Sequence, residues 1–218
     1  MEALSNAYHP NTVGISSLPF LEIPLLENVI TDTHFENRDR QGRTITLLAR
    51  AAEITGQRSY AISANNATAI CVNELGIARV FGEFPAFDDY AFFLQPGCTD
   101  AAFGPETMSD GQPLTWDLDG KAVSVYRVPG TVGGTHTFDL STFLDGSGGS
   151  WQHWSADNGV LSISADGNEP ENCNPSGVYD PQLASLSVYP HPTSGPVELL
   201  GDLTSLKSIE LFDLNGLR

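Results

Sequence analysis

A single long helical segment lies in a chain that is otherwise divided into short β-type runs. Between Arg38 and Ile54, apolar residues recur at helical spacing, and Gly56 follows as a helix-ending residue. A short buried strand is expected just before this helix, at residues 26–32. Runs typical of strands come after it, separated by Gly, Pro and Asp, at 60–63, 68–72, 77–81, 91–94 and 123–128. This order predicts an α/β sheet that continues into a β-rich part.

The composition changes after residue 129. Glycine and serine now interrupt the chain, most densely at 146–150, which is typical of a flexible connection, and strands are expected at 135–140 and 159–164. Residues 169–177 have the composition of a linker. A small β module is expected beyond the linker, with strands at 186–189, 197–200 and 209–214. We therefore predict three parts, at 1–129, 130–182 and 183–218.

The chain is strongly acidic, and its few basic side chains are clustered. Its 218 residues carry 27 acidic and 10 basic side chains, a formal charge of −17. This charge excludes a nucleic-acid partner and an anionic membrane, because both bind through Lys and Arg. Five arginines nevertheless fall between Arg38 and Arg58. No apolar run approaches the roughly 20 residues of a transmembrane helix, and the first residues lack the pattern of a signal peptide.

Neither a metal site nor a cofactor site is predicted. The cysteines Cys71, Cys98 and Cys173 have no Cys-x-x-Cys spacing and no nearby histidine pair. Glycine-rich phosphate loops and the Gly-x-Ser-x-Gly elbow of serine hydrolases are absent from the sequence. We expect Cys71 to be buried within its apolar run. Cys98 and Cys173 lie in turn-rich segments. In an oxidising compartment, the sequence is compatible both with a disulfide between them and with two free thiols.

The densest polar cluster surrounds one histidine. His34 can act as a general base near neutral pH, and Asp32 would orient it if the two share a loop. The arginines that follow have a planar fork suited to carboxylates; they are Arg38, Arg40 and Arg43. From spacing alone, the alternative is a solvated helix face on which arginines pair with acidic neighbours, namely Glu36, Asp39 and Glu53.

Two tryptophans form a second candidate site. Trp151 and Trp154 flank His153 and would form an aromatic surface for carbohydrate, unless they belong to the core. Aromatic side chains in short strands are more often core residues.

The residues around His34 resemble a known peptidase motif. Residues 29–43 read Val-Ile-Thr-Asp-Thr-His-Phe-Glu-Asn-Arg-Asp-Arg-Gln-Gly-Arg, similar to the Asp-x-His-Phe-x-x-Arg-x-Arg-x-Gly-Arg motif of cyanophycinase-like serine peptidases, relatives of dipeptidase E. The resemblance spans about residues 7–128. It implies an α/β fold, part of a three-layer sandwich of the class I glutamine amidotransferase-like type. It also implies action on aspartyl or β-aspartyl peptides, with no cofactor.

The resemblance assigns a role to each residue of the motif. In the family, a serine on a Gly-Thr-Ser-Ala-Gly elbow attacks the peptide carbonyl, the histidine accepts its proton, and a glutamate supports the histidine. His34 would therefore be the base. The remaining motif residues would shape the site or hold a substrate carboxylate; they are Asp32, Arg38, Arg40 and Arg43.

The chain departs from the family pattern in two places. The family's serine elbow lies upstream of this motif, so the nucleophile and half of the sheet are expected before Met1. Asn65 and Asn66 stand where the family has Asp and Glu. An asparagine cannot stabilise the imidazolium by charge, and substitution of a triad acid costs on the order of 10⁴ in rate in a serine protease. Impaired or absent activity is therefore expected.

The C-terminal residues resemble a secretion signal. Leu-Ser-Val-Tyr-Pro-His-Pro-Thr-Ser-Gly at 186–195 and Ile-Glu-Leu-Phe-Asp-Leu-Asn-Gly at 209–216 are similar to the type IX secretion C-terminal sorting domain of Bacteroidetes, a β-sandwich. His191 replaces the usual asparagine of Tyr-Pro-Asn-Pro, and the domain is cut short at 183–218. The resemblance implies a secreted or cell-surface protein, with the type IX machinery as a partner. The sequence is also compatible with a homodimer.

Three functions follow in order of preference. The first is a fragment of an exported cyanophycinase-like peptidase that is inactive as this chain, with a peptide as the substrate. The second is a noncatalytic secreted or surface binding protein on the same scaffold, which the Asn65-Asn66 pair favours. The third is a structural fragment that binds carbohydrate around Trp151 and Trp154.

Overall fold

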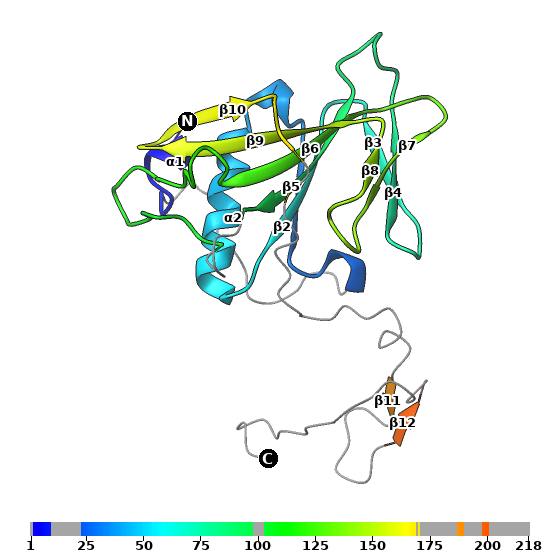
Figure 1. Cartoon of the computed structure of the whole chain (residues 1–218), viewed down its shortest axis with the longest axis horizontal. Coiled ribbons are helices and arrows are strands. Elements are labelled where there is room, and N and C mark those ends of the chain that lie inside the picture. Colours follow the sequence, from blue (N-terminus) through cyan, green and yellow to red (C-terminus); the bar gives the residue numbers. More distant parts are fainter. Residues whose placement is uncertain are drawn as a thin grey trace. The chain divides into compact units, whose positions relative to one another are not determined.

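The chain forms two compact units, residues 1–175 and 176–218. The computed structural model describes residues 2–9, 23–97, 103–168 and 170, and the backbone of 187–189 and 198–200. The first unit is mixed α/β, mostly sheet with few helices (Figure 1). In the second unit, the described residues form one antiparallel pair, β11 (Ser187–Tyr189) with β12 (Glu198–Leu200).

Two sheets make up most of the first unit. The larger sheet has six strands in the order β1-β2-β5-β6-β9-β10, and the smaller has four in the order β3-β4-β7-β8. The larger consists of β1 (Val29–Thr33), β2 (Tyr60–Ala64), β5 (Tyr90–Pro96), β6 (Val123–Pro129), β9 (Ser150–Asp157) and β10 (Val160–Ser164). The smaller consists of β3 (Ala69–Val72), β4 (Ile77–Phe81), β7 (His136–Asp139) and β8 (Gly146–Ser147).

One long helix crosses between two parallel strands. β1 and β2 are parallel, and the other neighbours in the six-stranded sheet are antiparallel. Parallel neighbours need a crossover, and α2 (Gln41–Thr55) supplies it. The other helical segments are short; they are α1 (Glu2–Ser5), η1 (Pro24–Leu26) and η2 (Glu36–Arg38).

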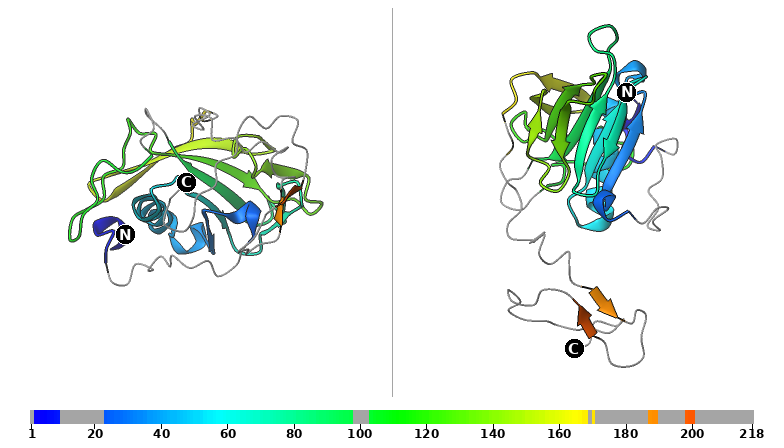
Figure 2. Two further views of the ribbon diagram at one scale, coloured as in Figure 1. Left: turned by 90° about the horizontal axis from the view of Figure 1, so that it is seen from below. Right: turned by 90° about the vertical axis from the view of Figure 1, so that its right-hand side faces the viewer.

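The six-stranded sheet has a hydrophobic core on each face. Successive strand residues point to opposite faces, so Phe92 packs in the cluster that contains Ile45 of α2, whereas Phe93 packs in the cluster that contains Phe138 of the smaller sheet. The larger sheet therefore lies between α2 and the four-stranded sheet (Figure 2). Each of these three phenylalanines is at most 1% exposed. Full burial of such a side chain contributes about 1.5–3 kcal/mol.

The predicted helix is confirmed with a shifted start. It was expected from Arg38, but η2 ends there and α2 begins at Gln41. Asp39 separates the two with a φ of 51°, a left-handed conformation that cannot continue a right-handed helix. The expected stop is confirmed, because Gly56 adopts a φ of 65° and donates a hydrogen bond of 3.0 Å to the Ala52 carbonyl.

The predicted strands before residue 129 and at 135–140 and 159–164 are confirmed, but the first begins at Val29 and not at Leu26, and only Asp32 in it is buried. β8 and β9 were not foreseen. Residues 146–150 are not a flexible connection, since β8 and the start of β9 lie there. The boundary that we predicted at Pro129 coincides with the end of β6. The later strands β7–β10 join the two sheets that begin before it.

The expected burial of Cys71 is wrong. Cys71 is an exposed free cysteine on β3, an edge strand whose residues are mostly exposed. Of the four residues of β3, only Ile70 packs against the core, and the sequence pattern does not reveal how little of this strand is covered. Cys98, Cys173, the predicted strand at 209–214 and the His191 position lie outside the described residues. None of the described helices is long and apolar enough to cross a membrane.

Candidate functional site

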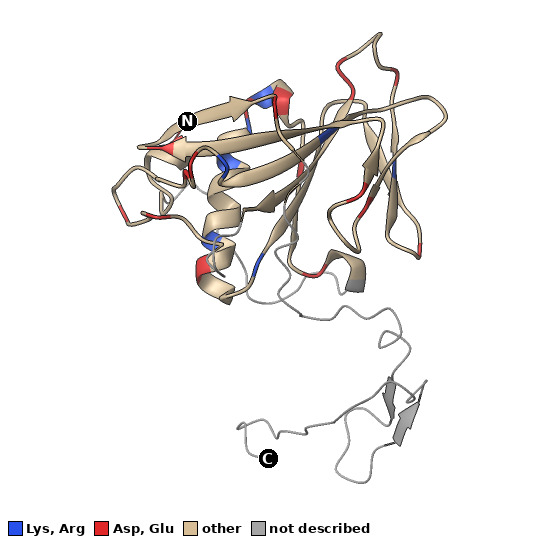
Figure 3. Cartoon of the chain, viewed as in Figure 1, with Lys and Arg blue, Asp and Glu red and all other residues tan. Residues whose placement is uncertain are grey.

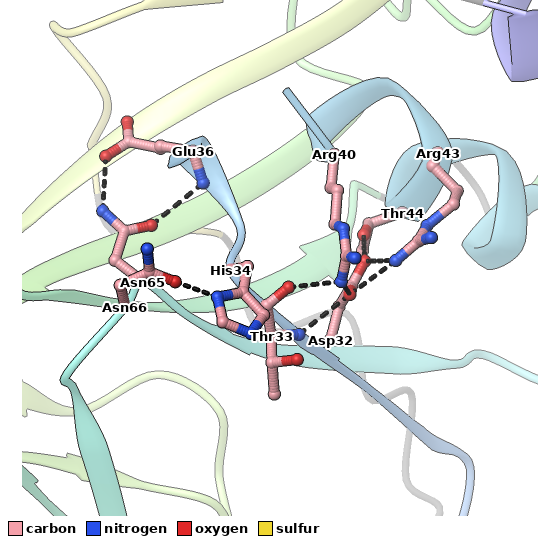
Figure 4. Close-up of polar contacts among 9 residues, drawn as sticks. All are labelled: Asp32, Thr33, His34, Glu36, Arg40, Arg43, Thr44, Asn65 and Asn66. Atoms are coloured by element: carbon pink, nitrogen blue, oxygen red, sulfur yellow. Dashed lines mark hydrogen bonds and ion pairs between the residues drawn. The ribbon is translucent and has the colours of Figure 1, made fainter. Parts of the chain in front are cut away.

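The candidate site lies where β1 and β2 end. Because these strands are parallel neighbours, paired from Val29 with Tyr60 to Thr33 with Ala64, their carboxyl ends meet at one edge of the sheet. His34 follows β1, and Asn65 and Asn66 follow β2 (Figure 4). Figure 3 shows that η2 and α2, which come next in the chain, carry basic residues. The fold thus brings together the motif at 29–43 and the Asn-Asn pair.

His34 and Asn66 contact each other through their side chains. Asn66 Oδ1 faces Nδ1 of His34, and both residues are exposed. Because an amide oxygen only accepts, a hydrogen bond between these two atoms would require the ring proton on Nδ1 and would leave Nε2 as an acceptor. His34 has a φ of 53°, and the Asn66 backbone N–H donates to Asn37 Oδ1 at 2.8 Å. The backbone after β1 therefore positions the His34 side chain, and the backbone after β2 positions the Asn66 side chain.

Asn65 is a buried structural residue. It is 4% exposed, and both its amide oxygen and its amide nitrogen have hydrogen-bond partners. Its Oδ1 accepts the Glu36 backbone N–H at 2.9 Å, and its Nδ2 donates to Glu36 Oε2 at 3.0 Å and to the Asp88 carbonyl at 2.9 Å. Asn65 thus joins the end of β2 to η2 and to the segment before β5. Of the two asparagines, only Asn66 contacts the histidine.

We expected Asp32 to orient His34, and this expectation is wrong. Asp32 binds arginines instead. Its carboxylate accepts from Arg43 Nη2 at 2.6 Å through each oxygen and from Arg40 Nη1 at 2.9 Å. Thr44 and the backbone N–H of Thr33 add hydrogen bonds of 3.2 and 2.8 Å. The Asp32 side chain is 5% exposed. A buried carboxylate needs such partners, so Asp32 ties β1 to the start of α2.

The arginines of the motif are not equivalent. Arg40 Nη1 also donates to the Thr33 carbonyl at 2.5 Å, so Arg40 and Arg43 are occupied within the protein. Arg38 is exposed and forms no ion pair with the residues that the structure describes. The alternative of pairing along the helix surface holds for one expected acid only, since Arg50 Nε lies 3.7 Å from Glu53.

A further basic residue enters the site from β6. Arg127 Nη2 lies 3.4 Å from Glu36 Oε2, and its guanidinium lies 3.3 Å from the ring centroid of Tyr90. Sequence reasoning missed Arg127 because it is 91 residues from Glu36. No spacing rule connects the two, and only the antiparallel pairing of β5 with β6 brings Arg127 next to Tyr90 and Phe92.

The tryptophan site is not an aromatic surface. Trp154 is 1% exposed and belongs to the core on the α2 face, and Trp151 packs against Tyr126 with a centroid distance of 5.1 Å. The interpretation as core residues is therefore confirmed for Trp154. His153, between them, has its pKa lowered below that of an exposed histidine by burial and, secondarily, by Lys121.

The described residues contain no group of three or more His, Cys, Asp or Glu side chains placed to hold a metal ion. No protein-family model, curated protein or solved structure matches the chain. The function must therefore be inferred from the residues themselves.

Proposed function

We propose that this chain is part of an exported cyanophycinase-like serine peptidase that acts on aspartyl or β-aspartyl peptides, with His34 as the general base. The contact between Asn66 Oδ1 and His34 Nδ1 carries the proposal. A base in a nucleophilic triad needs a third group that fixes its tautomer, and asparagine performs this task in Cys-His-Asn proteases. Nε2 would then accept the proton of an attacking hydroxyl.

Two parts of the proposal follow from sequence resemblances, the fold from the peptidase motif and export from the sorting pattern. The finer fold would be a partial class I glutamine amidotransferase-like sandwich, for which the β1-α2-β2 crossover is the supporting feature. Export would rest on the type IX sorting pattern at 183–218, most of which lies outside the described residues. The chain itself should be inactive, because the Gly-x-Ser-x-Gly elbow is absent from its sequence.

The test uses the reading frame extended upstream of Met1. The extended reading frame should encode a serine elbow. The protein that it encodes should hydrolyse Asp-Ala or β-Asp-Ala dipeptides slowly. The variant His34→Ala should abolish hydrolysis, and Asn66→Glu should raise it, since a carboxylate stabilises the imidazolium. An upstream frame without an elbow serine, or hydrolysis that survives His34→Ala, would remove the proposal.

A second candidate is a noncatalytic secreted or surface binding protein on this scaffold. The observation that favours it is the neutral side chain of Asn66, which offers orientation without charge. Such a protein would bind an aspartyl peptide and leave it intact. Binding without hydrolysis, in the extended protein and in its Asn66→Glu variant alike, would select this candidate over the peptidase.

A further inference from the structure

Arg127 lies near the site and has donors that no described residue uses. Its ion pair with Glu36 is 3.4 Å long, whereas a charge-assisted hydrogen bond is usually about 2.7–2.9 Å. Its Nε is buried without a hydrogen-bond partner, and no described residue accepts from its Nη1. Arg43 also has a buried Nε without a partner, but Arg40 and Arg43 contact the Asp32 carboxylate at 2.9 and 2.6 Å, closer than the contact of Arg127 with Glu36. The donors of Arg127 are thus far from satisfied.

The position of Arg127 is fixed by an aromatic ring. The guanidinium lies 3.3 Å from the centroid of Tyr90, a cation–π contact. Tyr90 also packs against Phe84 with a centroid distance of 4.9 Å. The side chain of Arg127 is 27% exposed, so the fork is held in place and remains accessible to solvent. Because the Arg127 side chain is already held in place, binding a ligand there costs little additional side-chain entropy of the protein.

Glu36 links Arg127 to the histidine site. Its Oε2 accepts from Asn65 Nδ2 at 3.0 Å as well as facing Arg127, and it lies two residues from His34. Asn65 in turn precedes Asn66, which contacts His34. The hydrogen bond to Asn65 keeps Glu36 in place. The Glu36 carboxylate interacts only weakly with the Arg127 guanidinium and would compete there with the carboxylate of a ligand.

We infer that Arg127 binds the side-chain carboxylate of an acidic peptide and so determines specificity at this site. The inference rests on the proposed peptide function and deepens it. Among the motif arginines, Arg40 and Arg43 already contact Asp32, and the exposed Arg38 has no ion pair with a described residue that would hold its fork in place. A planar guanidinium with free donors is the group best suited to a carboxylate. A ligand carboxylate would share the fork with Glu36 or displace it.

Calorimetric binding of Asp-Ala and Asn-Ala to the whole chain tests the inference. Arg127→Gln should weaken Asp-Ala binding by about tenfold or more, as expected for a lost charged hydrogen bond, and leave Asn-Ala unchanged. Arg127→Lys should weaken it less. Glu36→Gln should strengthen Asp-Ala binding, because the competing carboxylate is gone, a gain that a purely structural ion pair does not predict. Arg79→Gln, an exposed arginine on β4, is the matched control.

The outcomes separate the inference from the proposed function. If Asp-Ala binds equally well to wild type and Arg127→Gln, or if Glu36→Gln gives no gain, Arg127 is not the specificity residue and the peptide function stands. If wild type binds neither dipeptide, the peptide function fails and the role of Arg127 fails with it. Thermal melts identify a variant that does not fold, and Arg127→Lys and Glu36→Gln then decide the question.

Discussion

Nη2 of Arg43 lies 2.6 Å from both carboxylate oxygens of Asp32. Together with Arg40, this pair fastens the end of β1 to the first turn of α2. Asp32 also accepts the Thr33 N–H at 2.8 Å, immediately before His34. The cluster around Asp32 therefore holds the backbone from which His34 projects, while Asn66 approaches His34 from β2. Position and tautomer of the histidine thus depend on two different side chains.

Asp32→Asn should destabilise the protein. The substitution removes the charge that compensates two guanidinium groups, and the lost charged hydrogen bonds are worth about 1–3 kcal/mol in all, because Arg40 and Arg43 are partly exposed and regain some solvation. Urea unfolding would measure the loss. Asp157→Asn, an exposed residue at the end of β9, is the control and should change stability by less than about 0.5 kcal/mol. Equal effects of the two substitutions would show that the cluster around Asp32 has no structural role.

Asn66→Ala should change the tautomer of His34. With Asn66 present, the proton of the neutral ring should reside on Nδ1, because Oδ1 of Asn66 can only accept. Without that acceptor, the neutral ring should distribute its proton over both nitrogens. Long-range ¹H–¹⁵N correlation spectra of the imidazole report the tautomer directly. Asn37→Ala, which removes the acceptor of the Asn66 N–H, should have a smaller effect. A wild-type ring protonated on Nε2 would contradict this assignment.

Stability should fall as the solution is acidified, through His153. Burial lowers the pKa of His153, and Lys121 lowers it further. The unfolded chain then binds a proton near pH 6.5, where the folded protein does not, so acidification favours unfolding. The Asn168 N–H donates to Nε2 at 3.3 Å and Nδ1 is buried without a partner, so the ring has no place for a second proton.

The contribution of His153 to stability is fully present above about pH 6.5, the pKa of the unfolded histidine. It is lost as the pH falls from there toward the lowered pKa of His153 in the folded protein. His153→Gln should flatten the decline in denaturation midpoint between about pH 7.5 and 5. Lys121→Gln should flatten it less, because Lys121 is the smaller cause. An unchanged slope in His153→Gln would assign the pH dependence to other groups.

Gly148→Ala should destabilise the protein more than Gly111→Ala. Both glycines have positive φ, 79° and 73°, which costs an alanine roughly 1–2 kcal/mol. A Cβ on Gly148 would lie 2.1 Å from Cδ2 of His136, whereas a Cβ on Gly111 would meet nothing within 4 Å. The difference between the two unfolding free energies measures the close approach of the His136 ring to Gly148, in the turn between β8 and β9. Equal losses would show that the backbone conformation alone requires glycine at 148.

Some predictions from the sequence succeeded because the signal is local. The helix at 41–55 follows from apolar spacing, and its end at Gly56 follows from glycine's tolerance of positive φ. The proximity of His34 to position 66 was indicated by the peptidase-like motif. Other predictions failed where a contact partner is distant. Asp32 was expected to orient His34, but its carboxylate accepts charge-assisted hydrogen bonds from arginines that lie 8 and 11 residues further along the chain.

The sequence by itself determined the helix, most strands, the acidic surface and the pattern around His34, because each depends on residues within a few positions of one another. Only the tertiary structure decided the rest. The parallel pairing of β1 with β2 placed Asn66, and not Asp32, against the histidine. The antiparallel pairing of β5 with β6 brought Arg127 over Tyr90 and within reach of Glu36. Such contacts depend on strand order and register, which short-range periodicity does not encode.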